Sequence, residues 1–481
     1  MMRSKQSKSR SRDRYSSQAH RVLIPEFQLL QVSYSAAENE AVFSGPTEYV
    51  TLGGEDGYYP NFPVIIQGNG EPWRIANLYL TTKLQRESGY ESRTFRGIAD
   101  HLLNYLRFLE DEGLDYLYLP KNNRLKATFR YHKHLIELRD LGEISTSTAG
   151  ARINAIAIFY RSIIDWNIIH KEEIPHLPFE DVVKKIIVTS GFGTQNAINV
   201  KSHNLAIKTP RNNLPAEYIR DGGSLRPLVL SHQILILKAL LSSSREYQLI
   251  FYFALFTGAR MQTAGTIRTR HLYGNLDGDG NLRLSVGSGT CIDTKRGTPL
   301  TLLVPGWLVR DMIIYSRSPE AVKRRKRSFY GDTDDNYLFL SKNGIPYYTS
   351  KRELYDRQNS LVSRNTLLTD RASEVSIQDG GSIRQHIIEI LIPRIRKEEP
   401  EFQNFTFHDL RATFGMNLLE SQLKHLGNRA ITAAIDYVQQ RMGHRDKSTT
   451  MQYLNYKSRL EWKSQVESEF EQALFKYVRL T

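Results

Sequence analysis

The sequence predicts a mainly α protein with a small antiparallel sheet, an α+β fold, and three observations lead to this prediction. Apolar residues recur at the spacing of a helix face between Leu78 and Pro178. The same spacing returns from Ile383 to Ile395 and dominates toward the C-terminus. Between these parts, Leu282 to Val286 alternates apolar and polar residues and Thr301 to Val304 is rich in β-forming residues, as expected of strands.

Length and charge limit the range of functions. At 481 residues the chain is long enough for two or three domains, and its formal net charge of +14 favours a polyanionic partner. Charge alone does not separate DNA from RNA or an acidic membrane surface. A single cysteine, Cys291, excludes an internal disulfide and fits a reducing cytoplasm. No apolar run approaches the roughly 20 residues that span a bilayer, so no membrane partner is expected.

The N-terminal part is expected to contain two segments. Residues 1–22 carry seven Lys and Arg against one Asp, with many serines, and predict a disordered basic arm. This arm is either a solvated tail or a DNA contact. Residues 23–77 mix short β-rich pieces with Gly and Pro. They form either a small recognition or dimerisation module or a structural cap.

Residues 78–194 are predicted to form a compact helical domain. Ile98, Leu102, Leu106 and Leu109 share one helix face, and a further helix is expected to end near Gly142. Its basic residues either track DNA phosphates or are ordinary surface charges. These residues are Arg130, Lys133, Arg139, Arg152 and Arg161.

Residues 195–227 are polar and rich in Pro and Gly, and predict an interdomain linker, which would suit a protein that closes around a duplex. The last domain, 228–481, is expected to begin with a helix capped by Ser231. A buried helix from Tyr247 to Phe256 then runs into Thr257-Gly258-Ala259-Arg260.

The basic run Lys323 to Arg327 has three interpretations. It is a nuclear address, a loop that contacts phosphates, or a plain solvated loop.

A site that acts on a phosphodiester without a metal would need basic side chains. The transition state of phosphoryl transfer carries extra negative charge, and planar guanidinium groups hold such oxygens bidentately. Arg260 and Arg411 are the candidates. His408 lies one helical turn before Arg411, so both side chains can point at one spot.

The proton donor and the nucleophile each have a candidate and a competitor. A departing 5′ oxygen needs a proton, which Lys295 could supply from the turn between the two predicted strands, with Arg296 as its competitor. Tyr453 follows His444 by nine residues, and Tyr456 is its competitor. Cationic neighbours are expected to lower the phenol pKa from about 10.

In chain order these residues give Arg, His-x-x-Arg, Gly-His and Tyr, an order that resembles the tyrosine recombinase (phage integrase) family. The resemblance implies that a tyrosine attacks DNA and leaves a 3′-phosphotyrosine and a free 5′-hydroxyl. It implies that the two arginines activate the phosphate, the first histidine and the lysine handle protons, and the second histidine binds the phosphate. These roles carry over to Arg260, Lys295, His408, Arg411, His444 and Tyr453.

The resemblance covers about residues 228–470 well, as a catalytic domain, and 78–178 loosely, as the family's helical core-binding domain. Thr263 stands where members commonly carry an acidic residue that supports the first arginine. The stretch from about 348 to 402 is longer than a compact member needs, and the first 77 residues match nothing in the family.

The family's expected partners are double-stranded DNA at attachment or recombination sites, three further copies of the chain in a tetramer, and a directionality or accessory protein. The resemblance implies a bacterial cytoplasmic protein of a mobile element, acting at the nucleoid. The helical segment 460–478 docks either on a neighbouring subunit or within its own.

Two other functions remain open from the sequence. One is DNA relaxation as in type IB topoisomerases, and the other is a DNA-binding accessory protein without strand transfer. The sequence lacks a phosphate loop for ATP, a Cys/His cluster with zinc spacing and clustered carboxylates in its key motifs, so no cofactor or metal is expected.

Overall fold

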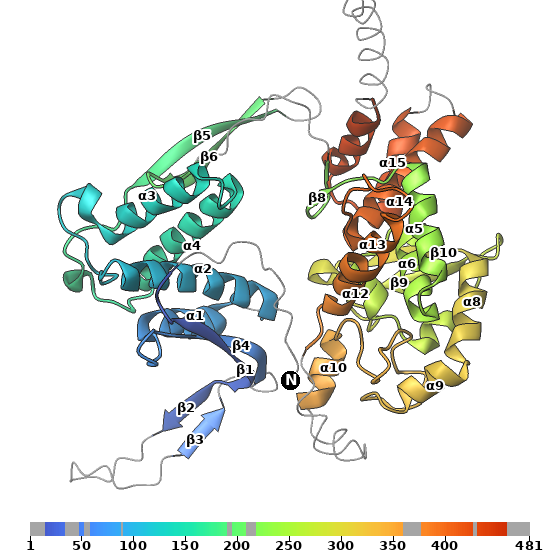
Figure 1. The fold of residues 1–481 in the computed structure, drawn as a ribbon, viewed down its shortest axis with the longest axis horizontal. Helices are drawn as coiled ribbons and strands as arrows, with labels where there is room; N and C mark the ends of the chain where they lie inside the picture. The colour runs from blue at the N-terminus through green and yellow to red at the C-terminus, as the bar shows by residue number, and fades with distance from the viewer. Residues whose placement is uncertain are drawn as a thin grey trace, which may run out of the picture. The chain divides into compact units, whose positions relative to one another are not determined.

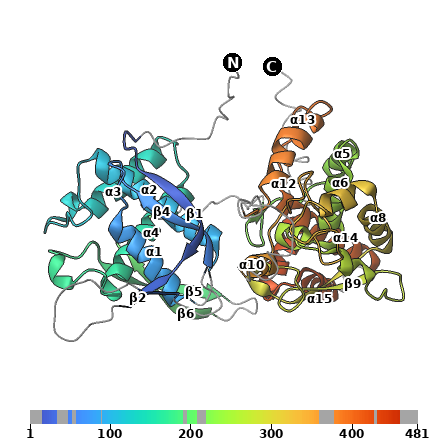
Figure 2. The ribbon, with the colours of Figure 1, turned by 90° about the horizontal axis from the view of Figure 1, so that it is seen from below.

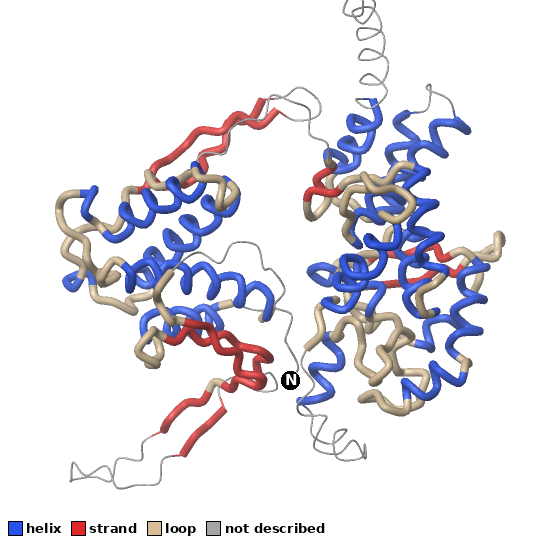
Figure 3. Tube along the Cα trace, viewed as in Figure 1, coloured by secondary structure: helices blue, strands red, loops and turns tan. Residues whose placement is uncertain are grey.

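The structure is a computed structural model that describes residues 15–33, 48–51, 58–87, 90–189, 195–207, 218–358, 377–426 and 431–458 (Figure 1). The chain divides into two compact units, Met1–Arg211 and Asn212–Thr481. Helices dominate both units, and the strands form small antiparallel pairs (Figure 3). The predicted fold class is therefore confirmed.

The first unit packs helices against short strand pairs. Strand β1 (His20–Gln28) pairs with β4 (Tyr58–Ile66), β2 (Leu30–Ser33) with β3 (Glu48–Thr51), and β5 (Asp181–Thr189) with β6 (Gln195–His203). The β1–β4 pair lies against helix α2 (Figure 2). The helices are α1 (Arg74–Arg86), α2 (Ser92–Asp111), η2 (Asn123–Leu125), α3 (Ala127–Asp140), α4 (Thr146–Asp165) and η3 (Lys171–Glu173).

The core of the first unit follows the apolar periodicity of its sequence. Leu102, Leu106 and Leu109 of α2 are buried as predicted. The buried hydroxyls of Tyr105 and Tyr160 lie 2.8 Å apart, so these two core side chains satisfy each other.

Two regions predicted to lack regular structure contain ordered elements, the N-terminal arm in the first unit and the predicted linker, which continues into the second unit. Residues 1–14 lie outside the described residues, but part of the predicted disordered arm is fixed, because β1 begins at His20 and Asp111 accepts hydrogen bonds from Ser16 and Ser17. The predicted linker, residues 195–227, contains β6 and a second, shorter hairpin. The domain boundaries stay a prediction.

The basic residues of the helical domain are mostly engaged with carboxylates. Arg130 pairs with Glu112, Lys133 with Glu137, Arg139 with Asp140 and Arg161 with Asp181. These exposed pairs favour the interpretation of ordinary surface charges for those four residues.

The second unit builds a helical body around a two-stranded sheet. Helices α6 and α14 pack against each other in its middle (Figure 1). Its strands are β7 (Ile219–Arg220), β8 (Ser224–Leu225), β9 (Leu282–Val286) and β10 (Leu300–Val304). Its first helices are α5 (Leu230–Leu241), α6 (Arg245–Thr257), α7 (Met261–Gly265), η4 (Thr269–Tyr273), η5 (Lys295–Gly297), α8 (Gly306–Ser316) and α9 (Pro319–Arg325). The later ones are α10 (Lys351–Gln358), α12 (Gly381–His386), the π-helix η6 (Ile387–Leu391), α13 (Ile392–Ile395), α14 (Phe407–Leu426) and α15 (Ile431–Met442).

Local predictions for the second unit succeed except at one helix start. β9 and β10 pair antiparallel with Lys295 between them, and α6 covers the predicted buried helix. Ser231 is not an N-cap, because α5 already begins at Leu230 after Val229, which makes no side-chain cap. The Gln233 side chain instead donates to the carbonyl of Leu228 at this end of the helix.

The basic run Lys323 to Arg327 is in part a structural element. The Arg324 side chain is buried, lies 2.7 Å from Glu246 and donates to the carbonyl of Leu340. Arg325 pairs with Asp332 at 2.8 Å and donates to the carbonyl of Ser316. None of the three interpretations foresaw this burial, and only Lys323, Lys326 and Arg327 are exposed.

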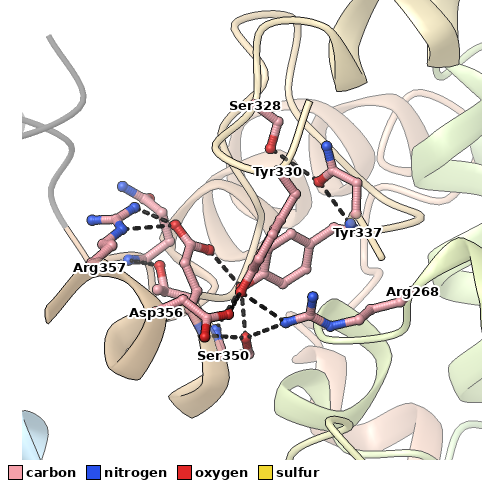
Figure 4. Close-up of polar contacts among 11 residues, drawn as sticks. Arg268, Ser328, Tyr330, Tyr337, Ser350, Asp356 and Arg357 are labelled. Carbon is pink, nitrogen blue, oxygen red and sulfur yellow. Dashed lines mark hydrogen bonds and ion pairs between the residues drawn. The ribbon is translucent and has the colours of Figure 1, made fainter. Parts of the chain in front are cut away.

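A buried polar cluster fixes α10 to the body of the second unit, and Figure 4 shows its contacts. We call Arg268, Tyr330, Tyr337, Ser350, Glu353 and Asp356 the Arg268 cluster. Arg268 lies over the ring of Tyr330 at 4.5 Å and donates to the hydroxyls of Tyr330 and Ser350. Tyr337 donates to Glu353 at 2.6 Å and Tyr330 to Asp356 at 2.8 Å.

Two predicted features lie outside the described residues, namely the middle of the long stretch, 359–376, and the C-terminal segment 460–478. Among the helices that the structure describes, none combines the length and apolar character needed to cross a bilayer.

Candidate active site

Arg260 is positioned by a tight turn after α6. Gly258 ends that helix with φ +70°, in the left-handed region that favours glycine. A Cβ there would also lie 2.5 Å from Phe414, so α6 approaches α14 closely at this point. Arg260 follows as the N-cap residue of α7. The sequence Thr257-Gly258-Ala259-Arg260 thus reverses the chain and presents the arginine at the α6–α14 contact.

Arg411 sits on the first turns of α14 and holds three segments together. Its guanidinium is almost fully buried, at 2% exposure. Nη1 donates to the carbonyl of Gly258 and Nη2 to that of Met442, each at 2.7 Å. The Nε–H donates to Asp221 at 2.7 Å, at the centre of the site.

His444 and Tyr453 come from the turn and helix after α15. Gly443 follows the end of α15 with φ +64°, and a further helix covers residues 447–458. Tyr453 is fully buried, and its ring fits because position 415 in α14 is glycine: a Cβ there would lie 2.6 Å from Tyr453 Cε1. Tyr456 on the same helix is only partly buried.

The carboxylate of Asp221 is where four of these side chains meet. It lies in the turn between β7 and β8 and is 6% exposed. Oδ1 accepts from Arg260 Nη2 at 3.1 Å. Oδ2 accepts from Arg411 Nε at 2.7 Å and from the hydroxyl of Tyr453 at 3.3 Å, and lies 3.1 Å from His444 Nε2. We call these five residues the Asp221 cluster.

The contacts of His444 define how its ring is used. A carboxylate only accepts hydrogen bonds, so Nε2 is the nitrogen that donates to Asp221. Nδ1 lies 2.9 Å from the hydroxyl of the buried Thr450, which donates to it in the neutral ring. The Thr450 hydroxyl therefore selects the tautomer that directs an N–H at the centre of the site.

Lys295 also reaches this site. A Cβ built on Gly222, the residue after Asp221, would lie 3.4 Å from Lys295 Nζ. Its competitor Arg296 has φ +60° in the turn between β9 and β10. The turn brings the Lys295 amine next to the residue that follows Asp221.

The charges of Arg260 and Arg411 also act on His408. Burial is the main cause that lowers its pKa below the ordinary 6.5, and the charges of Arg260 and Arg411 lower it further. His408 is therefore neutral at pH 7 and can accept a proton.

Asp221 is held as an anion. Burial alone raises its pKa, but the hydrogen bond from His444 and the charges of Arg411, His444 and Arg260 outweigh burial and hold the pKa well below its usual range.

The structure reverses the sequence prediction that cationic neighbours lower the pKa of Tyr453. Burial and the negative charge of Asp221 raise this pKa far above 10, and Arg411 offsets the rise only in part. The prediction counted the arginines but did not include the carboxylate that lies between them and the phenol.

Asp221 is the residue that the sequence did not reveal. It lies 39 positions before Arg260 and 232 before Tyr453, inside a segment predicted to be a linker. The only local signal is Asp221-Gly222-Gly223, which indicates a turn and no chemistry. Thr263, which replaces the acidic residue expected there, is buried, and Asp221 supplies a carboxylate to Arg260 instead.

Comparisons with known proteins give structural likeness without sequence likeness. No model of a known family and no curated protein matches the chain. Among solved structures, the chain is similar to the Tn1549 transposon integrase in complex with circular intermediate DNA. The two share 14% identity, with 79% of this chain and 94% of that chain covered and a TM-score of 0.42.

Two further solved structures match the chain with similar identity and TM-score. A lambda integrase dimer bound to a core site shares 14% identity, with 79% and 94% of the two chains covered and a TM-score of 0.41. The XerH site-specific recombinase bound to a palindromic difH substrate shares 13% identity, with 78% and 80% covered and a TM-score of 0.41. These proteins are of the kind that the sequence motifs resemble.

Proposed function

We propose that the chain is a tyrosine recombinase, a site-specific DNA recombinase that cuts and rejoins DNA through a 3′-phosphotyrosyl intermediate. One observation carries the proposal. Two arginines, a histidine and a tyrosine hydroxyl, from segments far apart in the sequence, all donate to one buried anion. A scissile phosphodiester is an anion with two non-bridging oxygens, and the same donors suit it.

In the proposed reaction Arg260, Arg411 and His444 hold the non-bridging oxygens of the phosphate. The Tyr453 oxygen attacks phosphorus and its proton passes to neutral His408. The bond from phosphorus to the 5′ oxygen breaks, and Lys295 protonates that oxygen as it leaves. Rejoining is the reverse, with a 5′-hydroxyl attacking the phosphotyrosine, so the step conserves bond energy and needs neither ATP nor a metal.

The biological setting follows from this reaction class. The partner is double-stranded DNA at attachment or recombination sites, and two duplexes exchanged at once require four copies of the chain. Integration or excision of a mobile element in a bacterial cytoplasm, aided by a directionality or accessory protein, is the proposed role.

The test is covalent trapping on nicked DNA. Purified full-length protein is incubated, without metal or ATP, with nicked fragments that tile the DNA flanking its gene, and adducts are mapped by denaturing gels and peptide mass spectrometry. We expect an adduct at Tyr453 that Tyr453→Phe abolishes while DNA binding persists. Tyr456→Phe is the matched control, since it changes a phenol one helical turn away, and it should keep the adduct.

Three other outcomes would contradict parts of this proposal. An adduct at Tyr456 would overturn the assignment of the nucleophile. Relaxation of supercoiled plasmid without preference for any fragment would indicate a topoisomerase. Tight DNA binding without any adduct would indicate an accessory protein.

A further inference from the structure

The centre of the proposed site is already occupied by a carboxylate of the chain itself. Every group assigned to hold the phosphate, namely Arg260, Arg411 and His444, points at Asp221, and so does the Tyr453 hydroxyl. The single Nε–H of Arg411 donates to Asp221, and the backbone carbonyls bound to its two Nη atoms fix the orientation of the guanidinium, so this Nε–H cannot reach a phosphate while Asp221 stays in place.

We propose that Asp221 is a built-in substitute for the scissile phosphate, which closes the site until DNA displaces it. This inference rests on the proposed function. The carboxylate matches a phosphodiester in the features that these donors recognise: one negative charge, shared over two oxygens that accept from different arginines. Two anions cannot share the position between these donors, because like charges at contact distance repel strongly where water is excluded.

The hairpin that carries Asp221 has a buried apolar base and a glycine-rich tip. Ile219 and Leu225 pair with each other and are buried among the side chains that surround Tyr453. The tip is Asp221-Gly222-Gly223, with Gly222 at φ +73°. The tip can therefore swing away, through glycine torsions, while its apolar base stays in place.

The hairpin also touches the helix that carries the nucleophile. The backbone N–H of Arg220 donates to Gln452 Oε1 at 2.9 Å, and Gln452 directly precedes Tyr453. Withdrawal of Asp221 would both vacate the phosphate position and remove a negative charge from beside the phenol, which favours its deprotonation.

Asp221 could instead be a positioning residue that supports the arginines during the reaction, in place of the acidic residue absent at position 263. That role and the blocking role predict opposite signs when the carboxylate is removed. The experiment therefore compares Asp221→Asn with Asp279→Asn. Asp279 is an exposed aspartate flanked by glycines in the same unit, and it contacts none of the site residues described above.

The first readout is the rate of adduct formation on nicked DNA, measured per folded molecule. We expect Asp221→Asn to react faster by on the order of tenfold, the worth of a charge-assisted hydrogen bond that DNA no longer has to break. Asp279→Asn should react like the natural chain. A slower reaction in Asp221→Asn with unchanged DNA binding would overturn the proposal in favour of a positioning role.

The second readout is the binding of inorganic phosphate, which does not depend on DNA cleavage. Inorganic phosphate should raise the melting temperature of Asp221→Asn in a saturable way, because an anion that binds only the folded state stabilises it. The natural chain and Asp279→Asn should show at most a tenth of that affinity. Equal phosphate binding by all three proteins would overturn the proposal. If no protein forms an adduct, the proposed function fails, and the phosphate titration still decides whether Asp221 blocks an anion site.

A milder variant covers the case in which Asp221→Asn does not fold. Gln452→Ala keeps the carboxylate and removes only the bond to the Arg220 N–H. We expect its adduct to form faster by roughly threefold, the worth of one ordinary hydrogen bond. A rate equal to that of the natural chain would show that the hairpin does not limit the reaction.

Discussion

Two buried clusters of the second unit contain the same kinds of side chain but differ in charge balance. In the Arg268 cluster each tyrosine hydroxyl has its own carboxylate, and each carboxylate also has its own arginine, Arg357 for Glu353 and Arg352 for Asp356. In the Asp221 cluster one carboxylate serves two arginines, a histidine and a tyrosine.

The difference teaches how a functional cluster can be told from a structural one. In the Arg268 cluster each carboxylate is paired with its own arginine, and the cluster fixes α10 in place, although the buried Nε of Arg268 itself has no hydrogen-bond partner among the described residues. The Asp221 cluster has more donors than acceptors, and its positive charges would be uncompensated if the single carboxylate left. Residue types do not separate the two clusters, whereas the ratio of donors to anions does.

The largest expected effect comes from replacing the central arginine of each cluster with lysine. Arg411→Lys and Arg268→Lys should each lower the free energy of unfolding by about 1–3 kcal/mol, because lysine cannot reach several acceptors at once. Only Arg411→Lys should also slow adduct formation, by roughly 10² to 10³-fold. Chemical denaturation and single-turnover trapping measure the two effects. An equal loss of rate in Arg268→Lys would remove the distinction between the clusters.

The lysine assignment predicts a defect that depends on the leaving group. Lys295→Met should slow adduct formation by on the order of 10²-fold, while Arg296→Met should have little effect. A substrate with sulfur in place of the bridging 5′ oxygen should restore the rate of Lys295→Met, because a thiolate leaves without a proton. A defect that persists with sulfur would assign the proton transfer to another group.

Tyrosine replacements should affect the clusters in opposite ways. Tyr337→Phe removes the donor to Oε2 of the fully buried Glu353, whose Oε1 stays paired with Arg357, and should lower the free energy of unfolding by about 1–3 kcal/mol, with no change in adduct rate. Tyr453→Phe removes only a 3.3 Å contact to a carboxylate that keeps three other partners. It should change stability by less than about 1 kcal/mol while abolishing the adduct. Thermal unfolding of both variants checks the contrast.

The smallest expected effect is the contribution of His408 to the pH dependence of stability and of the adduct rate. The pKa of His408 lies below 6.5 in the folded protein, so as the pH falls the unfolded chain takes up its proton first. The contribution of His408 to stability is therefore constant above about pH 6.5 and is lost progressively below it.

The adduct rate should not decline because of His408 until the pH is below 6.5. His408→Gln should remove this acidic limb of the rate profile. His386 is a matched control, because burial also lowers its pKa, to about 4, but its ring stacks on Tyr247. His386→Asn should leave the profile unchanged.

Local sequence predicted several elements of the second unit and proposed the individual site candidates, but it missed the strands inside the predicted linker. The alternation from Leu282 to Val286 gave β9 with its observed bounds, because a strand with one buried face needs that period. Gly258 and the one-turn spacing of His408 and Arg411 are likewise local rules of helix geometry. The prediction at Ser231 failed because cap preference is weak compared with the packing that fixes where α5 begins.

Only the tertiary structure decided what these residues face. The burial of Arg324 depends on Glu246, and the charge state of Tyr453 depends on Asp221, and neither partner lies near in the sequence. The sequence by itself determined a mainly α fold and a set of basic and phenolic candidates, since propensity and periodicity act over a few residues. That a carboxylate from the supposed linker stands at their centre was decided by folding, because electrostatic interactions depend on distance in space and not on separation along the chain.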